Sequence, residues 1–221
     1  MAEQAGRDLE NASPQEILTW AIETFGNQFA IASSMAEAVL IDMAAKIRPN
    51  VPVVFLDTGY HFAETIGTRD AVAATYGVKL LSITPVRSVA EQDAQYGPKL
   101  YETNPDLCCA LRKVEPLERG LAPYLAWASG IRRDETANRR HVPVVGWDAK
   151  RGKVKVNPLA NWTQQQVDDY VRENNVLVNP LVSEGYPSVG CGPCTRRVAP
   201  GEDPRSGRWA GTGKTECGLH T

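Results

Sequence analysis

Apolar residues recur at helical and at strand spacing over most of the chain. From Pro14 to Phe25 they fall three and four positions apart, on one face of a helix that Ser13 and Glu16 would open as a capping box. Short apolar runs typical of buried strands cover 29–32, 51–56, 78–83, 124–129 and 142–147, and helical patterns cover 38–44, 63–76 and 163–174. Strands that alternate with helices predict an α/β fold in which helices flank a parallel sheet.

The pattern changes after residue 178. The segment 179–221 holds five Pro and eight Gly among its 43 residues, which is too many for regular elements. We therefore expect one α/β domain over 1–178 and a loop-rich tail over 179–221. Because three of the five cysteines lie in this tail, we expect it to work in one functional unit with the domain.

A polar turn follows the first predicted strand. Ser33, Ser34 and the backbone up to Glu37 lie between that strand and a helix, where free N–H groups and the helix dipole favour an anion. The same serines also fit a plain helix cap. The turn lacks the glycine spacing of a Walker loop or a dinucleotide-binding fingerprint, which disfavours those two kinds of site.

Charge and composition exclude several classes of protein. A net charge of -2 argues against a general nucleic-acid binder, because affinity for the phosphate backbone needs clustered excess Lys and Arg. The first ten residues carry four charged side chains and no apolar run, so we expect neither a signal peptide nor a membrane span. These features predict a soluble, cytoplasmic protein, in which five cysteines suit metal ligation or catalysis better than disulfides.

Four of the cysteines form two local pairs. Cys108 and Cys109 are adjacent, and Cys191 and Cys194 form a C-x-x-C that begins 82 positions beyond Cys109. Four thiolates suit either one zinc ion or a 4Fe-4S cluster, and adjacent ligands favour the cluster because each can bind a different iron. Buried thiols at 108 and 109 and a redox pair at 191 and 194 are the alternatives.

The fifth cysteine, Cys217, lies among glycines near the end of the chain. Lys214 and His220 are nearby cations that could favour its thiolate, the form in which a cysteine is nucleophilic. The alternative is an exposed thiol without a role.

Together these motifs resemble those of bacterial and plant-type adenylyl-sulfate reductases. The resemblance runs over nearly the whole chain and rests on the tail 216–220, on Cys108-Cys109 with Arg112-Lys113, and on 191–194. It implies an adenine nucleotide alpha-hydrolase-like fold, in which 33–37 replaces a modified phosphate loop and 56–59 lies near adenine. The family pattern has a glycine around 34 to 36, and this sequence has none.

The resemblance also implies a set of site residues. Cys217 would be the nucleophile, with His220 assisting and Lys113 at the phosphosulfate. Cys108, Cys109, Cys191 and Cys194 would hold a 4Fe-4S cluster. The implied substrate-binding residues are Ser33, Ser34, Glu37, Leu56, Gly130, Arg132, Arg140, Arg205 and Arg208. Arginine suits oxyanions, although without the resemblance these charges would be read as ordinary solvated loop residues.

The implied reaction converts adenosine 5′-phosphosulfate to AMP and sulfite in sulfate assimilation. Cys217 would take the sulfonate, and thioredoxin would then release it as sulfite. The plant enzymes carry a fused redox domain that 221 residues do not accommodate, so we expect a separate thioredoxin. The alternatives are a 3′-phosphoadenylyl-sulfate reductase and a zinc-stabilised nucleotide-binding regulatory protein. The oligomeric state stays open, a homo-oligomer included.

Overall fold

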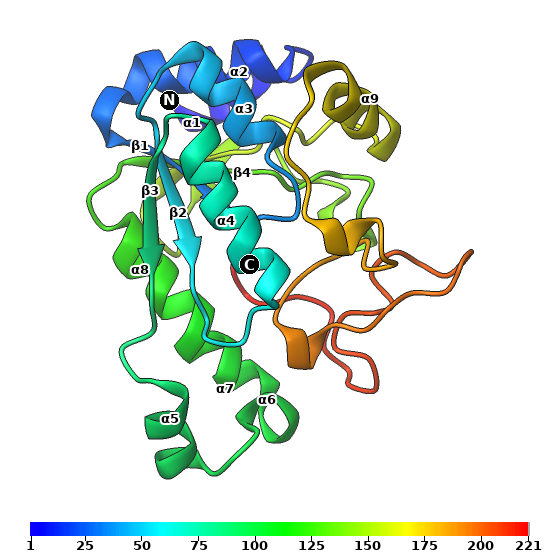
Figure 1. Ribbon diagram of the computed structural model, residues 1–221. Helices are drawn as coiled ribbons and strands as arrows, with labels where there is room; N and C mark the ends of the chain where they lie inside the picture. Colours follow the sequence, from blue (N-terminus) through cyan, green and yellow to red (C-terminus); the bar gives the residue numbers. More distant parts are fainter. Residues whose placement is uncertain (221) are drawn as a thin grey trace.

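The apolar runs form the strands of one sheet (Figure 1). In the computed structural model, which describes residues 1–220, six strands lie in the order β3-β2-β1-β4-β6-β5. Their bounds are β1 Phe29–Ser33, β2 Pro52–Leu56, β3 Lys79–Ile83, β4 Ala126–Ser129, β5 Val145–Asp148 and β6 Lys153–Val156. Every neighbouring pair is parallel except β5 and β6. The predicted α/β class and five of the strands are therefore confirmed.

Helices cover both faces of this sheet. Their bounds are α1 Ala2–Asp8, α2 Pro14–Phe25, α3 Val39–Ile47, α4 Ala63–Thr75, α5 Val89–Tyr96, α6 Leu100–Thr103, α7 Pro105–Cys109, α8 Glu115–Leu121 and α9 Gln164–Asn174. The predicted capping box opens α2 at Ser13, and a second capping box, of Thr163 and Gln166, opens α9. The helices α1 and α5 to α8 were not predicted from the sequence.

Alternate residues of the strands feed two separate cores. On β1, Phe29 and Ile31 enter a large core with α2 and α3, whereas Ala30 points to the other face. There a smaller core joins Ala30 and the β4 residue Trp127 to Leu117 and Leu121 of α8. This alternation follows from the two-residue period of a strand. The small core lies on the face beneath the end of the tail.

The β5–β6 hairpin adds one antiparallel pair to the predicted parallel sheet. Only four residues separate the two strands, and a parallel pair needs a crossover of a dozen or more residues. Asp148 accepts a hydrogen bond from the Arg151 N–H, and Gly152 takes a φ of 64° that favours glycine. The sequence patterns did not predict β6, the partner strand in this hairpin.

A widened turn interrupts the helix that carries the first cysteine pair. Residues Ala110–Val114 form a π-helical turn between α7 and α8. Pro116 follows it, and a proline has no N–H to donate to the carbonyl four residues back, so the helix cannot run regularly through this point. Such turns often mark functional sites. This one sets the directions of Arg112 and Lys113.

The segment 179–220 runs along the carboxyl edge of the sheet and turns back over it (Figure 1, orange to red). It begins beside the β1–α3 loop, where Asn179 donates to the Ala36 carbonyl, and Leu219 packs against the small core. Among the described residues, no helix is long and apolar enough to cross a membrane.

Candidate functional site

A cleft opens at the carboxyl ends of β1 and β4. The connections from β1 lead to β2 on one side, and β4 lies on the other, so this is the topological switch point where open α/β sheets bind ligands. Ser33 ends β1 and Ser34 follows it, Ser129 ends β4 and Gly130 follows it, and all four residues line the cleft. Its volume of about 570 Å³ suits a small-molecule ligand.

The loop after β1 makes its turn without glycine. The Ser33 hydroxyl accepts a hydrogen bond from the Met35 N–H at 3.2 Å, and Met35 takes a φ of 60° with its side chain fully buried. Ala38 is the N-cap of α3 and no side chain caps it, so neither serine caps this helix. The plain helix-cap interpretation of these serines is therefore wrong, and both residues line the cleft.

One end of the cleft is acidic. Glu37, Glu135 and Asp168 line it together with Arg132. Burial raises the pKa of the Glu37 carboxyl to about 7, and Glu135 and Asp168 add to this shift while Arg132 opposes it. Arg132 is already engaged, donating to Asp134 and Gln164. A further anionic group would meet repulsion at this end.

The other end of the cleft is cationic. Lys113, Arg205 and Arg208 line it, and all three were predicted as site residues, although Arg205 lies 3.5 Å from the Glu216 carboxylate. Arg208 lies over the Trp209 ring at 4.5 Å and donates to the Val189 carbonyl, but its buried Nε has no hydrogen-bond partner among the described residues. A buried donor without a partner is costly, so this nitrogen is poised to bind an oxyanion.

Arg140 lies apart from the other predicted residues. Its side chain is exposed and it does not line the cleft. The neighbouring Arg139 lines the cleft instead, and sequence reasoning missed it. Arg139 is buried and donates two hydrogen bonds to Glu216, at 2.9 and 2.8 Å.

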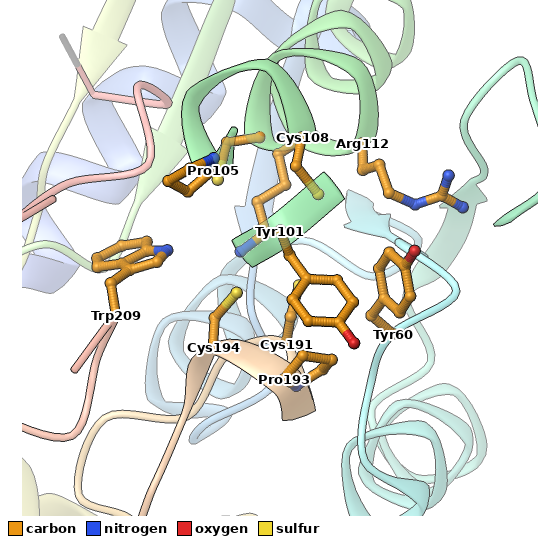
Figure 2. Close-up of a pocket in the computed structure, with 11 residues that line it drawn as sticks. Tyr60, Tyr101, Pro105, Cys108, Arg112, Cys191, Pro193, Cys194 and Trp209 are labelled. Carbon is orange, nitrogen blue, oxygen red and sulfur yellow. The ribbon is translucent and has the colours of Figure 1, made fainter. Parts of the chain in front are cut away.

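The four paired cysteines line one pocket beside the cleft (Figure 2). Figure 2 shows Cys108 and Cys194 approaching the same space from opposite sides, with Tyr60, Tyr101 and Trp209 around it. None of these cysteines is in a disulfide. Among the described residues, no three His, Cys, Asp or Glu side chains converge closely enough to hold a single metal ion.

The end of β2 joins the two cysteine pairs. The Thr58 hydroxyl lies 3.4 Å from the Cys191 sulfur, and the Gly192 N–H donates to the Tyr60 carbonyl at 2.7 Å. Arg112 donates from the other side to the Thr58 carbonyl at 2.5 Å. Thr58, which the resemblance placed in the segment near adenine, and Arg112, which had no assigned role, thus fix both pairs to one loop.

The close sulfurs disfavour one another's negative charge. Burial raises the pKa of Cys108 to about 12, with a further contribution from Cys109, Cys191 and Cys194. Burial and Cys191 likewise raise the pKa of Cys194 to about 11. Burial would also raise the pKa of Cys191, but Lys113 and Thr58 outweigh it and hold that pKa below its usual value. Four thiolates therefore need positive charge between them.

Lys113 connects the pocket to the cleft, since it lines both. Burial opposes its charge, yet nearby Cys191 and Cys217 raise its pKa above the ordinary value. Cys217 itself lines the cleft, as do Leu56 and His220. The fold therefore brings the nucleophile candidate, the shared lysine and the paired cysteines into one neighbourhood.

His220 lies on the floor of the cleft rather than in solvent. Its ring stacks on Trp127, with centroids 6.1 Å apart and planes 11° apart. Burial, Lys155 and Arg139 hold the pKa of His220 well below its usual range, so its imidazole is neutral at pH 7. Near neutral pH it can act through its shape and hydrogen bonds, and not as a cation that favours the Cys217 thiolate. Sequence reasoning did not single out Trp127, because the sequence of a strand does not indicate that its tryptophan will stack on a distant histidine.

Comparisons with known proteins identify the family to which this chain is related. Residues 27–197 match the family model of the phosphoadenosine phosphosulfate reductase domain. The chain is 63% identical over 220 residues to an adenosine 5′-phosphosulfate reductase of Streptomyces coelicolor, covering 100% of this chain and 93% of that protein. It is 56% identical, with the same coverage, to an adenosine 5′-phosphosulfate reductase of Mycolicibacterium smegmatis.

A solved structure supports the same relationship and the fold. The phosphoadenylyl-sulfate reductase of Candida auris, crystallised in a phosphate complex, superimposes with a TM-score of 0.74 at 33% identity, covering 89% of this chain and 96% of that one. Together with the site geometry, these matches show that the chain belongs to the phosphoadenosine phosphosulfate reductase family.

Proposed function

We propose that this protein reduces adenosine 5′-phosphosulfate to sulfite and AMP, with Cys217 as the nucleophile. The observation that carries the proposal is the meeting of Cys217, Lys113 and Arg208 at the cationic end of a cleft on the switch point of the sheet. Cations there neutralise the sulfate and phosphate oxygens, which would otherwise repel a thiolate. The names of the bacterial relatives point to the same substrate.

The charge of the cleft orients the substrate. The phosphosulfate lies toward Lys113, Arg205 and Arg208, and the nucleoside lies toward Ser33, Gly130 and Glu37. In this orientation the ribose approaches the acidic end. A 3′-phosphate would add negative charge near Glu37 and Asp168, which favours adenosine 5′-phosphosulfate over its 3′-phosphorylated form.

The first step transfers the sulfonate to the protein. The Cys217 thiolate attacks the sulfur, a bond forms between the two sulfur atoms, and the bond from sulfur to the AMP phosphate oxygen breaks. AMP leaves with the electron pair, and Arg208 and Lys113 stabilise its phosphate. The product on the protein is a Cys217 S-sulfonate.

The second step needs a dithiol reductant, which we assign to thioredoxin. One thiolate attacks the Cys217 sulfur and sulfite leaves with the bonding electrons, giving a mixed disulfide. The second thiol then frees Cys217, so the reductant is oxidised to a disulfide. The proposed location is the cytoplasm, because five cysteines without a disulfide suit a reducing compartment.

The paired cysteines fit a 4Fe-4S cluster better than zinc. Four thiols surround one space, yet among the described residues no three ligands converge on a single point, as a zinc ion requires. A cubane accepts ligands at four separate corners, and its irons would supply the positive charge that the four thiolates need. Cys108, Cys109, Cys191 and Cys194 would hold it, while Lys113 balances the remaining charge on the side of the cleft.

Anaerobic purification followed by intact mass analysis tests both the role of Cys217 and the cluster assignment. Wild type incubated with adenosine 5′-phosphosulfate should gain the mass of a sulfonate and release AMP, and Cys217→Ser should do neither. Iron and sulfide near four per chain would support the cluster. Zinc in place of iron, with no adduct on wild type, would refute the proposal. Faster turnover of the 3′-phosphorylated substrate would instead identify the protein as a 3′-phosphoadenylyl-sulfate reductase.

A further inference from the structure

Cys217 lies between two anchored points of the tail. Before it, Glu216 accepts two hydrogen bonds from Arg139, Nε to Oε1 at 2.9 Å and Nη2 to Oε2 at 2.8 Å. After it, Leu219 packs against the small core and His220 stacks on Trp127. We propose that the Arg139–Glu216 ion pair is a positioning device that aims the Cys217 sulfur at the substrate, with the His220 stack as its second support.

The Arg139–Glu216 pair differs from an ordinary surface ion pair. Only 10% of the Arg139 side chain and 13% of the Glu216 side chain are exposed. The paired, fork-shaped contact fixes both distance and plane, which a single hydrogen bond cannot do. Exposed pairs gain little because both side chains must be held still, whereas this pair lies where its partners already restrict them.

Arg139 is itself fixed to the body of the protein. Its Nη1 donates to Glu135 at 2.6 Å, and the same Glu135 oxygen accepts the Arg132 N–H at 2.8 Å. The carboxylate of Glu216 is therefore tied, through one guanidinium and one carboxylate, to the loop that follows β4. Because Glu216 immediately precedes Cys217, a shift at this contact moves the nucleophile directly.

The engagement of Arg139 also separates its role from that of the substrate-binding cations. All three of its nitrogens donate to Glu135 or Glu216, so the guanidinium has little capacity left for an oxyanion. Within residues 1–220, by contrast, the buried Nε of Arg208 has no hydrogen-bond partner, so it remains available to a ligand. Arg139 is thus a positioning residue, acting on the reaction through Glu216.

The experiment compares Arg139→Gln, Arg139→Lys, Glu216→Gln and the double variant R139Q/E216Q in a single turnover with saturating adenosine 5′-phosphosulfate. The rate of Cys217 S-sulfonate formation should fall about 100-fold in each variant, because a nucleophile displaced by about 1 Å loses that much. The substrate concentration giving half the maximal rate should change by less than about threefold. All of these variants lose the Arg139–Glu216 contact, so the double variant should be about as slow as Arg139→Gln; Glu216→Gln also removes the 3.5 Å contact between Glu216 and Arg205.

The Arg139→Lys variant distinguishes the effect of side-chain geometry from the effect of charge. It keeps the positive charge but not the planar fork, so Arg139→Lys should remain nearly as slow as Arg139→Gln. If Arg139 instead bound the substrate, lysine would restore much of the rate, and the half-saturating concentration would rise while the limiting rate stayed. That result would overturn the proposal.

Two controls complete the test. Arg119→Gln removes another two-pronged pair with glutamate, one that is 46% and 40% exposed on α8, and should keep the wild-type rate. Alkylation of Cys217 by iodoacetamide, monitored by intact mass analysis in the absence of substrate, should be faster in the Arg139 and Glu216 variants than in wild type. The proposal rests on the reductase function, and the outcomes are separable: no adduct on wild type refutes that function, whereas an adduct formed equally fast in all variants refutes only the positioning role.

Discussion

The pocket of paired cysteines and the neighbouring cleft manage charge in opposite ways. The pocket gathers four thiols whose negative charges disfavour one another, so it needs a positively charged group at its centre. The cleft divides its charges, with acids near Glu37 and cations near Arg208, so it can orient a ligand that is anionic at one end. Lys113 lines both regions. The comparison teaches that a ligand-holding pocket and a reaction site can share one cation and yet be disturbed separately.

Removing the nucleophile should have the largest effect and should leave the pocket intact. Cys217→Ser is expected to lower sulfite formation by at least about 10³-fold, because an alcohol does not replace the thiolate in the transfer step. Iron content, visible absorbance and AMP affinity should match those of wild type, since Cys217 does not line the pocket. Parallel loss of iron would show that the two regions cannot be separated.

Removing one of the paired cysteines should disturb the pocket and leave the cleft largely intact. Cys191→Ser takes away a buried sulfur that Thr58 and Lys113 contact. The variant should lose most of its iron and unfold at a temperature about 5 to 10 °C lower, because a bound metal group contributes folding free energy. Calorimetric titration with AMP should still detect binding in the cleft. A variant that kept its iron and Tm would contradict the ligand assignment.

The acidic end of the cleft predicts a pH dependence of stability. The pKa of Glu37 is about 7 in the folded protein, above the 4.5 of an ordinary glutamate. The folded state thus holds this proton more tightly, so stability falls as pH rises from about 4.5 to 7. Above pH 7 the charged carboxyl should cost about 2 kcal/mol once screening by water in the cleft is allowed for.

Glu37→Gln keeps the shape of the side chain and removes this titration. Wild type and the variant should unfold at similar urea concentrations near pH 5, where Glu37 is mostly protonated in the folded state. At pH 8 the variant should be more stable by about 2 kcal/mol, and subtracting the two curves cancels every other titrating group. Equal stability at both pH values would mean that Glu37 is well solvated.

The two regions also differed in how far the sequence could reveal them. Cys108 with Cys109 and Cys191 with Cys194 are each close in the chain, so their spacing alone suggested a shared site. The βαβ order likewise follows from local apolar periods, whereas β6 and the helices α5 to α8 lack a strong period. Arg139 and Glu216 are 77 positions apart, and only the folded chain shows that they pair.

Substitution of Arg140 has the smallest expected effect, and it tests whether this arginine lies outside the cleft as the structure shows. Sequence reasoning selected Arg140, but its side chain is exposed outside the cleft, while Arg139 is buried within it. An exposed charge away from the ligand is screened by water and salt. Arg140→Gln should therefore change kcat/KM for adenosine 5′-phosphosulfate by less than about twofold, measured at low and at moderate ionic strength. A tenfold loss would mean that the loop 131–140 rearranges when substrate binds and brings Arg140 inward.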